Sequence, residues 1–120
     1  MALFQQWHLL NNIDENIKKQ MIKEVTVQEL KTMMDNNADF VLIDVREQYE
    51  YDAANLGGIL VPLGSVIERH AEIPQDKPVV IHCRSGARSA TAIRELENRF
   101  GYTNLSNLKG GIMAWQSEIG

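Results

Sequence analysis

The sequence predicts an α/β fold with a mostly parallel central β-sheet of about five strands flanked by helices. Two apolar runs, 40–43 and 78–82, are rich in β-branched residues and have the composition of strands covered on both faces, as in parallel sheets. Segments of helical periodicity alternate with the strand-like runs, and no repeat is present. This alternation is typical of a parallel sheet with helices on both faces. A length of 120 residues suits one such domain.

The chain divides into an N-terminal extension, 1–22, and a domain, 23–120. Apolar residues in the extension recur at three- and four-residue steps, which predicts an amphipathic helix. We expect its apolar stripe to pack on the domain or on a second copy of the chain, and in the second case residues 1–22 would mediate self-association. The stripe consists of Phe4, Trp7, Leu10, Ile13, Ile17 and Met21.

The elements of the domain follow from local signals. After a short strand at 23–25, Thr26 and Glu29 have the spacing of a capping box, which predicts a helix from there to Met34. Gly101 is placed to end the helix that precedes it. The remaining elements are expected in this order: strand 40–43, helical turns 46–51, strand 59–61, helix 65–71, strand 78–82, helix 89–100, strand 102–105 and helix 112–117.

Composition and charge exclude several function classes. The formal net charge of −4 argues against a general nucleic-acid binder. A single cysteine excludes an internal disulfide framework and a Cys-x-x-Cys redox pair. Three scattered histidines lack the spacing of metal ligands, so no metal or cofactor is expected. No apolar run is long enough to span a membrane and no secretory signal is present, so we expect a cytoplasmic protein.

The single cysteine, Cys83, lies in a basic part of this acidic chain. Residues 77–94 contain no acidic side chain. A strand leads into the segment 83–88 and a helix follows it, which is the arrangement of an anion-binding loop lined by backbone N–H groups. These groups and the nearby arginines favour the thiolate, the nucleophilic form of cysteine. The alternative is a buried and inert cysteine at the end of a strand. The four basic residues are Lys77, Arg84, Arg88 and Arg94.

Three motifs along the chain resemble, in the same order, the motifs of a known family. The segment 83–89, Cys-Arg-Ser-Gly-Ala-Arg-Ser, resembles the active-site loop of rhodanese-like sulfurtransferases. Asp-Val-Arg-Glu at 44–47 is similar to an upstream signature of that family, and Leu-Lys-Gly-Gly-Ile-Met-Ala-Trp at 108–115 is similar to its C-terminal signature. The resemblance spans the chain from 24 to about 119 and implies the rhodanese-like fold.

The resemblance also implies a two-step sulfur transfer. Cys83 would attack the outer sulfur of an anionic donor such as thiosulfate and become a persulfide, and cyanide, a thiol or a protein would accept the sulfur. The two loop arginines would hold the donor, and main-chain N–H groups would stabilise the persulfide. Catalysis is thus expected of Cys83, and substrate binding of the residues that follow it: Arg84, Ser85, Gly86, Ala87 and Arg88.

The sequence departs from the family at one place and leaves two other functions open. Ala54-Asn55 stands where the family usually has Gly-His, and the segment up to Pro62 is one residue short.

Besides sulfur transfer, the second function left open is that of a phosphatase or arsenate reductase on the same scaffold. Four residues separate Cys83 from Arg88, one fewer than in similar phosphatases, and the tighter loop favours sulfur transfer. The third is a non-catalytic module that binds a partner protein.

Three further residues receive structural interpretations. We expect Asp44 and Arg46 to anchor the end of a strand by ion pairing, with Arg46 also paired to Glu50. His82 precedes the cysteine, but adjacent strand residues point to opposite faces of a sheet. We therefore expect His82 to pack or hydrogen-bond locally and not to act as a base.

Overall fold

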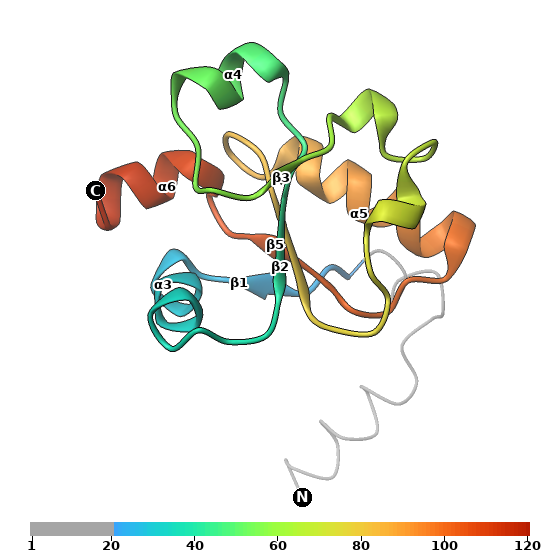
Figure 1. Ribbon diagram of the computed structural model, residues 1–120, viewed down its shortest axis with the longest axis horizontal. Coiled ribbons are helices and arrows are strands. Elements are labelled where there is room, and N and C mark those ends of the chain that lie inside the picture. The colour runs from blue at the N-terminus through green and yellow to red at the C-terminus, as the bar shows by residue number, and fades with distance from the viewer. Residues whose placement is uncertain (1–20) are drawn as a thin grey trace, which may run out of the picture.

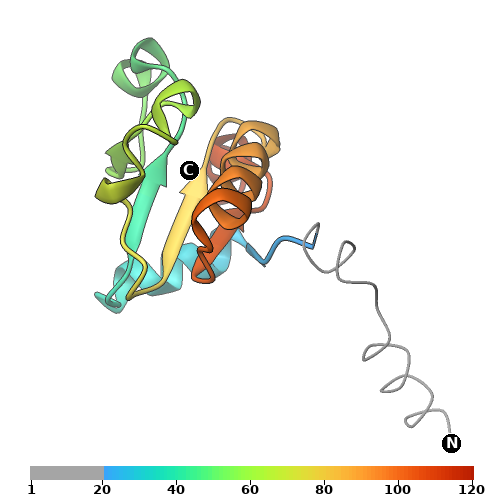
Figure 2. The ribbon, with the colours of Figure 1, turned by 90° about the vertical axis from the view of Figure 1, so that its right-hand side faces the viewer.

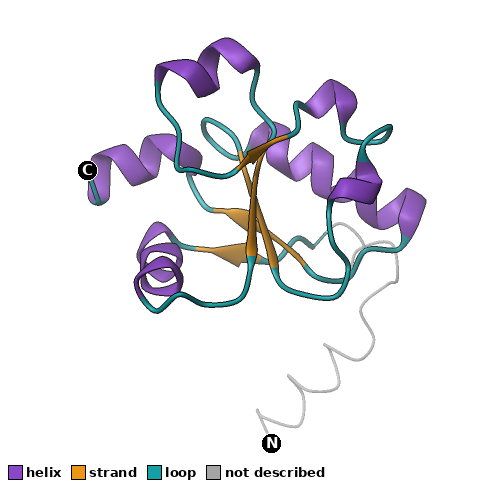
Figure 3. Cartoon of the chain, in the orientation of Figure 1, coloured by secondary structure: helices purple, strands orange, loops and turns teal. Residues whose placement is uncertain are grey.

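The computed structural model describes residues 21–120, so nearly all of the helix predicted for 1–22 lies outside the described residues. The described part is built on a five-stranded sheet in the order β1-β5-β4-β2-β3, and every neighbouring pair of strands is parallel. Figure 1 shows the chain from end to end, and Figure 3 shows the strands at the centre with helices around them. The strands are β1 Glu24–Val25, β2 Val41–Asp44, β3 Ile59–Leu60, β4 Val79–His82 and β5 Leu105–Leu108.

Helices cover both faces of the sheet because each face carries its own apolar cluster. One cluster joins Ile43 and Ile81 of the sheet to Ile93 of α5, and includes residues of the segment between β3 and β4. The other joins Leu42 and Val80 to helix α3 and to partly buried residues of α6. Figure 2 shows α5 lying beside β4. The helices are α3 Val27–Asp35, α4 Gln48–Ala53, α5 Ala87–Phe100 and α6 Gly111–Glu118, with 3₁₀ turns η1 Leu63–Ser65 and η2 His70–Glu72.

The fold class and two local signals are confirmed. The sheet is parallel, five-stranded and flanked by helices, as the alternation of strands and helices predicts. Thr26 and Glu29 form the capping box at the start of α3, with hydrogen bonds of 3.1 Å in both directions. Gly101 ends α5 in the left-handed conformation, with φ at 71°, a region that glycine enters without the steric cost of a Cβ.

Two predicted elements are wrong. The helix expected at 65–71 is replaced by the 3₁₀ turns η1 and η2, because Val66 is the only apolar side chain in that stretch that is fully buried and no apolar stripe exists to hold a longer helix. The strand expected at 102–105 instead runs over Leu105–Leu108. Tyr102 precedes it because its hydroxyl lies 2.6 Å from the carbonyl oxygen of His70, which ties it to the loop.

The topology gathers the three motifs at one edge of the sheet. Parallel strands end on the same side, and in register Asp44 of β2 lies opposite His82 of β4. The loop after β4, helix α4 after β2, and the start of α6 after β5 therefore meet at the carboxyl edge. Ligands of open parallel sheets bind at this edge. None of the helices within 21–120 is long and apolar enough to cross a membrane.

Candidate active site

Cys83 directly follows β4 and begins a short loop that leads into α5. Its side chain is 1% exposed. Gly86 is the last loop residue before the helix and has φ at 114°, a conformation that side chains other than glycine rarely adopt. The glycine therefore allows the chain to turn sharply around the sulfur and enter the helix.

Hydrogen-bond donors from the loop and from α5 surround the Cys83 sulfur. The Gly86 N–H donates to Sγ at 3.1 Å and the Ser89 N–H at 3.5 Å, while the Ser89 hydroxyl lies 3.4 Å away. Burial alone would raise the pKa of Cys83, but bonds from the Ser89 hydroxyl and from the N–H groups of Ser89, Gly86 and Ser85 outweigh it. The pKa of the thiol is thus lowered, and the thiolate is the favoured nucleophile.

Helix α6 fixes the first two carbonyl groups of the loop. The N–H groups of Ile112 and Met113 donate to the carbonyls of Cys83 and Arg84, both at 3.0 Å. In a trans peptide the N–H points opposite to the preceding C=O. Fixing the Cys83 and Arg84 carbonyls toward α6 therefore turns the N–H groups of Arg84 and Ser85 away from the helix, and the Ser85 N–H is one of the groups that lower the pKa of Cys83. The C-terminal motif at 108–115 thus supports the cysteine loop. Sequence patterns alone do not reveal this supporting role.

Gly111 makes this close approach possible. A Cβ at Gly111 would lie 2.4 Å from the Arg84 carbonyl oxygen and 2.6 Å from that of Cys83. Both distances are far inside van der Waals contact, and the obstacle is backbone, which cannot rotate away. Gly111 also has φ at 60°. The second glycine of the pair at 110–111 is therefore required by packing as well as by conformation.

Ser89 and Asn107 form a buried polar pair behind the sulfur. The Ser89 Oγ lies 2.6 Å from Asn107 Oδ1 and 3.2 Å from the Gly86 carbonyl oxygen. The Asn107 amide also donates to the Gly86 carbonyl at 3.0 Å. A hydroxyl has a single hydrogen, so Asn107 Oδ1, the nearest acceptor, competes with the Cys83 sulfur for it. Neither residue was singled out from the sequence, although Ser89 lies inside the loop motif.

The two loop arginines have different surroundings. The Arg88 guanidinium forms two hydrogen bonds to the Glu50 carboxylate, at 2.7 and 2.9 Å. These bonds lower the pKa of Glu50 to about 2 against the opposing effect of its burial. Arg84 is exposed, and its side chain has no ion pair or hydrogen bond within residues 21–120. Of the two cations expected to hold an anionic donor, Arg84 is therefore the one without a counter-charge in the described chain.

Arg46 anchors the end of β2, but with a different partner set from the one expected. Its guanidinium donates to both oxygens of the buried Asp44 carboxylate, at 2.8 to 3.1 Å, and to the Ala54 carbonyl at 2.7 Å. Its contact with Glu50 is to the backbone carbonyl, at 3.4 Å. The expected ion pair between Arg46 and the Glu50 side chain is wrong, because Arg88 takes that carboxylate.

His82 lies beneath the loop and is fully buried. Its Nδ1 is 3.4 Å from the Cys83 carbonyl oxygen, and its Nε2 is 3.6 Å from Asp44 Oδ2 without a hydrogen bond. Burial lowers the pKa of His82 and outweighs the nearby Asp44 carboxylate, so the ring is neutral at neutral pH. These contacts agree with local packing rather than with a role as a base for the thiol.

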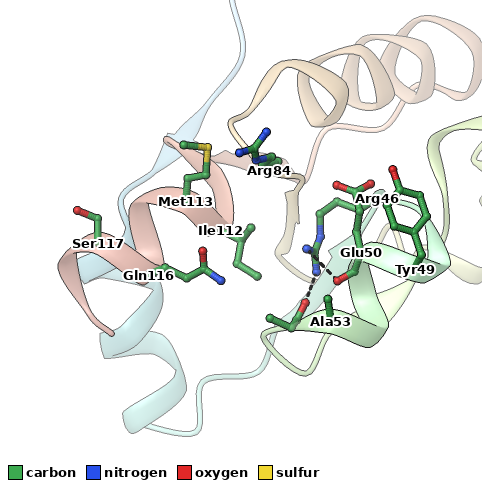
Figure 4. A pocket seen from close by; sticks show the side chains of 10 residues that line it. Arg46, Tyr49, Glu50, Ala53, Arg84, Ile112, Met113, Gln116 and Ser117 are labelled. Atoms are coloured by element: carbon green, nitrogen blue, oxygen red, sulfur yellow. Dashed lines mark hydrogen bonds between the residues drawn. The ribbon is translucent and has the colours of Figure 1, made fainter.

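A cavity of about 610 Å³ opens beside the loop, between α4 and α6. In Figure 4, Tyr49 and Ala53 lie on the α4 side, Ile112, Met113 and Gln116 on the α6 side, and Arg84 at the end of the cavity nearest the loop. No sequence pattern indicates this cavity, because its two walls are far apart along the chain. Within residues 21–120 no group of three His, Cys, Asp or Glu side chains could hold a metal ion.

Comparisons with known proteins agree on one family. Residues 26–118 match the family described as "Rhodanese-like domain". A sulfurtransferase of Allochromatium vinosum is 39% identical over 101 residues, which cover 79% of this chain and 89% of that protein. A "Rhodanese-like Domain Protein" of Staphylococcus aureus has a solved structure that superposes with a TM-score of 0.72 at 26% identity, covering 78% of this chain and 91% of the other.

Some relatives are much longer than this chain. The "Probable adenylyltransferase/sulfurtransferase MoeZ" of Mycobacterium tuberculosis is 34% identical over 98 residues. The match covers 79% of this chain but only 25% of that protein. The similarity is therefore to one domain of such a relative.

Proposed function

This chain belongs to the rhodanese-like domain family, and we propose that it transfers sulfane sulfur from an anionic donor such as thiosulfate, through a persulfide on Cys83, to a thiophilic acceptor. Sulfur transfer is the chemistry that the family and the relative from Allochromatium vinosum support. The donor, the persulfide, the acceptor and a cytoplasmic location are our proposal. The acceptor is cyanide, a thiol or a protein.

The observation that carries the proposal is the set of donors around the Cys83 sulfur. A thiolate with two backbone N–H donors within 3.5 Å, and with the Ser89 hydroxyl at 3.4 Å, is a stabilised nucleophile. Donors of this kind also stabilise a persulfide, whose outer sulfur carries the negative charge. The N–H groups cost no reorganisation during the reaction because α6 and Gly111 already hold the loop.

The first step balances without an oxidant or reductant. The Cys83 thiolate attacks the outer sulfur of thiosulfate, a new S–S bond forms, and sulfite leaves with the electron pair of the old one. We assign donor binding to Arg84, Ser85, Gly86, Ala87 and Arg88, with Arg84 as the main attraction because Glu50 already balances the charge of Arg88. In the second step the acceptor attacks the outer sulfur and the electron pair returns to Cys83 Sγ.

A steady-state assay of sulfur transfer from thiosulfate to cyanide tests this function. We expect turnover in the intact chain and none in Cys83→Ser. Arg84→Gln should raise the KM for thiosulfate, by about fivefold for the loss of one exposed charge interaction. Arg94→Gln is the matched control, because Arg94 is also exposed but lies further along α5. Equal effects of the two substitutions would contradict the assigned role of Arg84.

An aryl phosphate hydrolysis assay on the same protein preparation distinguishes sulfur transfer from phosphatase chemistry. Asp44 and Glu50, two acidic side chains at the same edge of the sheet as the loop, are both paired with arginines, which leaves neither free as a general acid for a phosphate leaving group. We therefore expect no Cys83-dependent hydrolysis of an aryl phosphate. Hydrolysis without sulfur loading would establish the phosphatase, and neither activity would favour a protein-binding module.

A further inference from the structure

His82 is a buried titratable residue that the proposed mechanism does not use. Its side chain is 0% exposed, and the ring lies between two acceptors. Nδ1 is 3.4 Å from the Cys83 carbonyl oxygen, and Nε2 is 3.6 Å from Asp44 Oδ2. Burial lowers the pKa of His82, so the neutral ring carries a single hydrogen at neutral pH. Only one of the two acceptors therefore receives a hydrogen bond from the ring.

The lone pairs of the two acceptors decide which ring nitrogen carries this hydrogen. Asp44 Oδ2 accepts two hydrogen bonds from the Arg46 guanidinium, at 3.1 and 2.8 Å, which is the full capacity of one carboxylate oxygen. The Cys83 carbonyl oxygen accepts the Ile112 N–H at 3.0 Å and keeps a second lone pair. Nδ1 lies within hydrogen-bond distance of that oxygen, whereas Nε2 has no hydrogen-bond partner among the described residues. The hydrogen therefore belongs on Nδ1.

A hydrogen bond from Nδ1 orients the first peptide group of the cysteine loop. This peptide group consists of the Cys83 carbonyl and the Arg84 N–H, which point in opposite directions because the bond is trans. Its carbonyl is held from two sides, by His82 and by Ile112. The Arg84 N–H therefore points away from both, and it has no hydrogen bond within residues 21–120. Two bonds to the carbonyl also polarise the peptide group, which makes this N–H a stronger donor.

We propose that His82 is a positioning residue for sulfur loading: as the Nδ1–H tautomer, it holds the Cys83 carbonyl so that the Arg84 N–H is free to donate to the bound sulfur donor. The proposal rests on the proposed persulfide function. When the Cys83 thiolate attacks thiosulfate, negative charge moves from Sγ to the sulfite that leaves. An N–H group fixed before the reaction stabilises that charge without reorganisation. His82 is fully buried beneath the loop, so it neither contacts the donor nor moves a proton.

The nitrogen chemical shifts of the His82 ring test the tautomer. The full chain is labelled with ¹⁵N, and long-range ¹H–¹⁵N spectra at neutral pH distinguish a protonated ring nitrogen from an unprotonated one. The signals of His82 are assigned with the double substitution His8→Gln and His70→Gln, which leaves His82 as the single histidine. We expect a protonated Nδ1 and an unprotonated Nε2. A hydrogen on Nε2, or rapid exchange between the two nitrogens, would overturn the proposal.

Two variants of equal size test the role of His82 in sulfur loading. His82→Asn keeps an amide N–H near the position of Nδ1, whereas His82→Leu has the same shape without a donor. Intact mass follows single-turnover loading with thiosulfate. We expect His82→Asn to load within about twofold of the wild-type rate and His82→Leu to load about tenfold more slowly, which is the effect of one lost hydrogen bond. Both variants remove the same ring, so the difference between them reports the N–H donor and not the cavity.

Alkylation of Cys83 by iodoacetamide is the control reaction, because this neutral reagent brings no sulfite group to the loop. Its rate should be equal in His82→Asn and His82→Leu. Equal loading by the two variants, or an equal loss of loading and alkylation in His82→Leu, would overturn the proposal. A wild-type protein that loads no sulfur would refute the proposed function and the role in loading together. A hydrogen on Nε2 in a protein that does load sulfur would refute the role of His82 alone.

Discussion

The Glu50 carboxylate of α4 holds the Arg88 guanidinium of α5 through two hydrogen bonds, of 2.7 and 2.9 Å, across 38 positions of sequence. The pair joins the helix after β2 to the helix that starts at the cysteine loop. Arg88 therefore fixes the end of the loop, and its charge is balanced before any donor binds. This relationship has a direct consequence for stability and its pH dependence.

We predict that Glu50→Gln destabilises the fold by about 1–3 kcal/mol, because it leaves a partly buried guanidinium with a weaker partner. The pKa of Glu50 is about 2 in the folded chain against an ordinary 4.5. The stabilisation is therefore complete above 4.5 and is lost as pH falls toward about 2. Urea unfolding at several pH values measures both effects.

The control for this prediction is Asp76→Asn, which removes an exposed carboxylate that has no hydrogen bond among the described residues. It should leave stability and its acid dependence nearly unchanged. If Glu50→Gln keeps the wild-type loss of stability below pH 4.5, the ion pair does not cause that loss.

We predict that Gly111→Ala disrupts the site, whereas Gly101→Ala only weakens the fold. Both glycines have positive φ, 60° and 71°, so each substitution costs about 1–2 kcal/mol in backbone strain. Only at Gly111 would the new Cβ also meet backbone, the Arg84 carbonyl at 2.4 Å, for a further ~1–3 kcal/mol. Urea unfolding and the rate of Cys83 alkylation measure the two effects. Equal stability and alkylation in the two variants would show that the contact with α6 does not shape the loop.

We predict that Ser89→Ala raises the pKa of Cys83, because the thiolate loses its hydroxyl donor. The rate of Cys83 alkylation by iodoacetamide is measured against pH, and the midpoint of this curve gives the pKa of the thiol. Thr91→Ala is the matched control, since the Thr91 hydroxyl bonds the Ala87 carbonyl on the exposed side of α5.

Substitution of Asn107 tests whether Asn107 Oδ1 and the Cys83 sulfur compete for the hydroxyl hydrogen of Ser89. Asn107→Leu should shift the midpoint downward, because the hydroxyl is then free to donate to sulfur. The same substitution should have no effect on the midpoint in a Ser89→Ala background. An upward shift in both backgrounds would mean that Asn107 acts through the Gly86 carbonyl instead.

The division of the chain at 22/23 remains a prediction. A truncated chain that starts at Lys23 should fold and should still gain sulfur from thiosulfate, because the cysteine loop and its supports lie within 24–118. Size-exclusion chromatography of both forms tests whether 1–22 mediates self-association. A folded truncate that takes up no sulfur would show that the N-terminal segment shapes the site.

The fold could be predicted from local patterns, but the partners within the site could not. Apolar runs and capping signals locate β2, β4 and α3, and the loop motif locates Cys83. The pairing of Glu50 with Arg88 and of Ser89 with Asn107 depends on how separate elements meet at the sheet edge. The sequence predicts the last strand at 102–105 and not at 105–108 because Tyr102 is a buried aromatic residue, as strand residues often are. Its hydroxyl instead holds the loop that contains His70 and Ile73.

The central claim is that Cys83 carries the transferred sulfur, and intact mass spectrometry of thiosulfate-treated protein tests it most directly. The account predicts a gain of one sulfur atom, located on the peptide that contains Cys83 and removed by cyanide or a reductant. Ser85→Ala, which alters a loop side chain but keeps the Ser85 N–H, should still gain the sulfur. A Cys83→Ser protein that gains the same mass, or a wild-type protein that gains none from thiosulfate or from an organic persulfide, would contradict it.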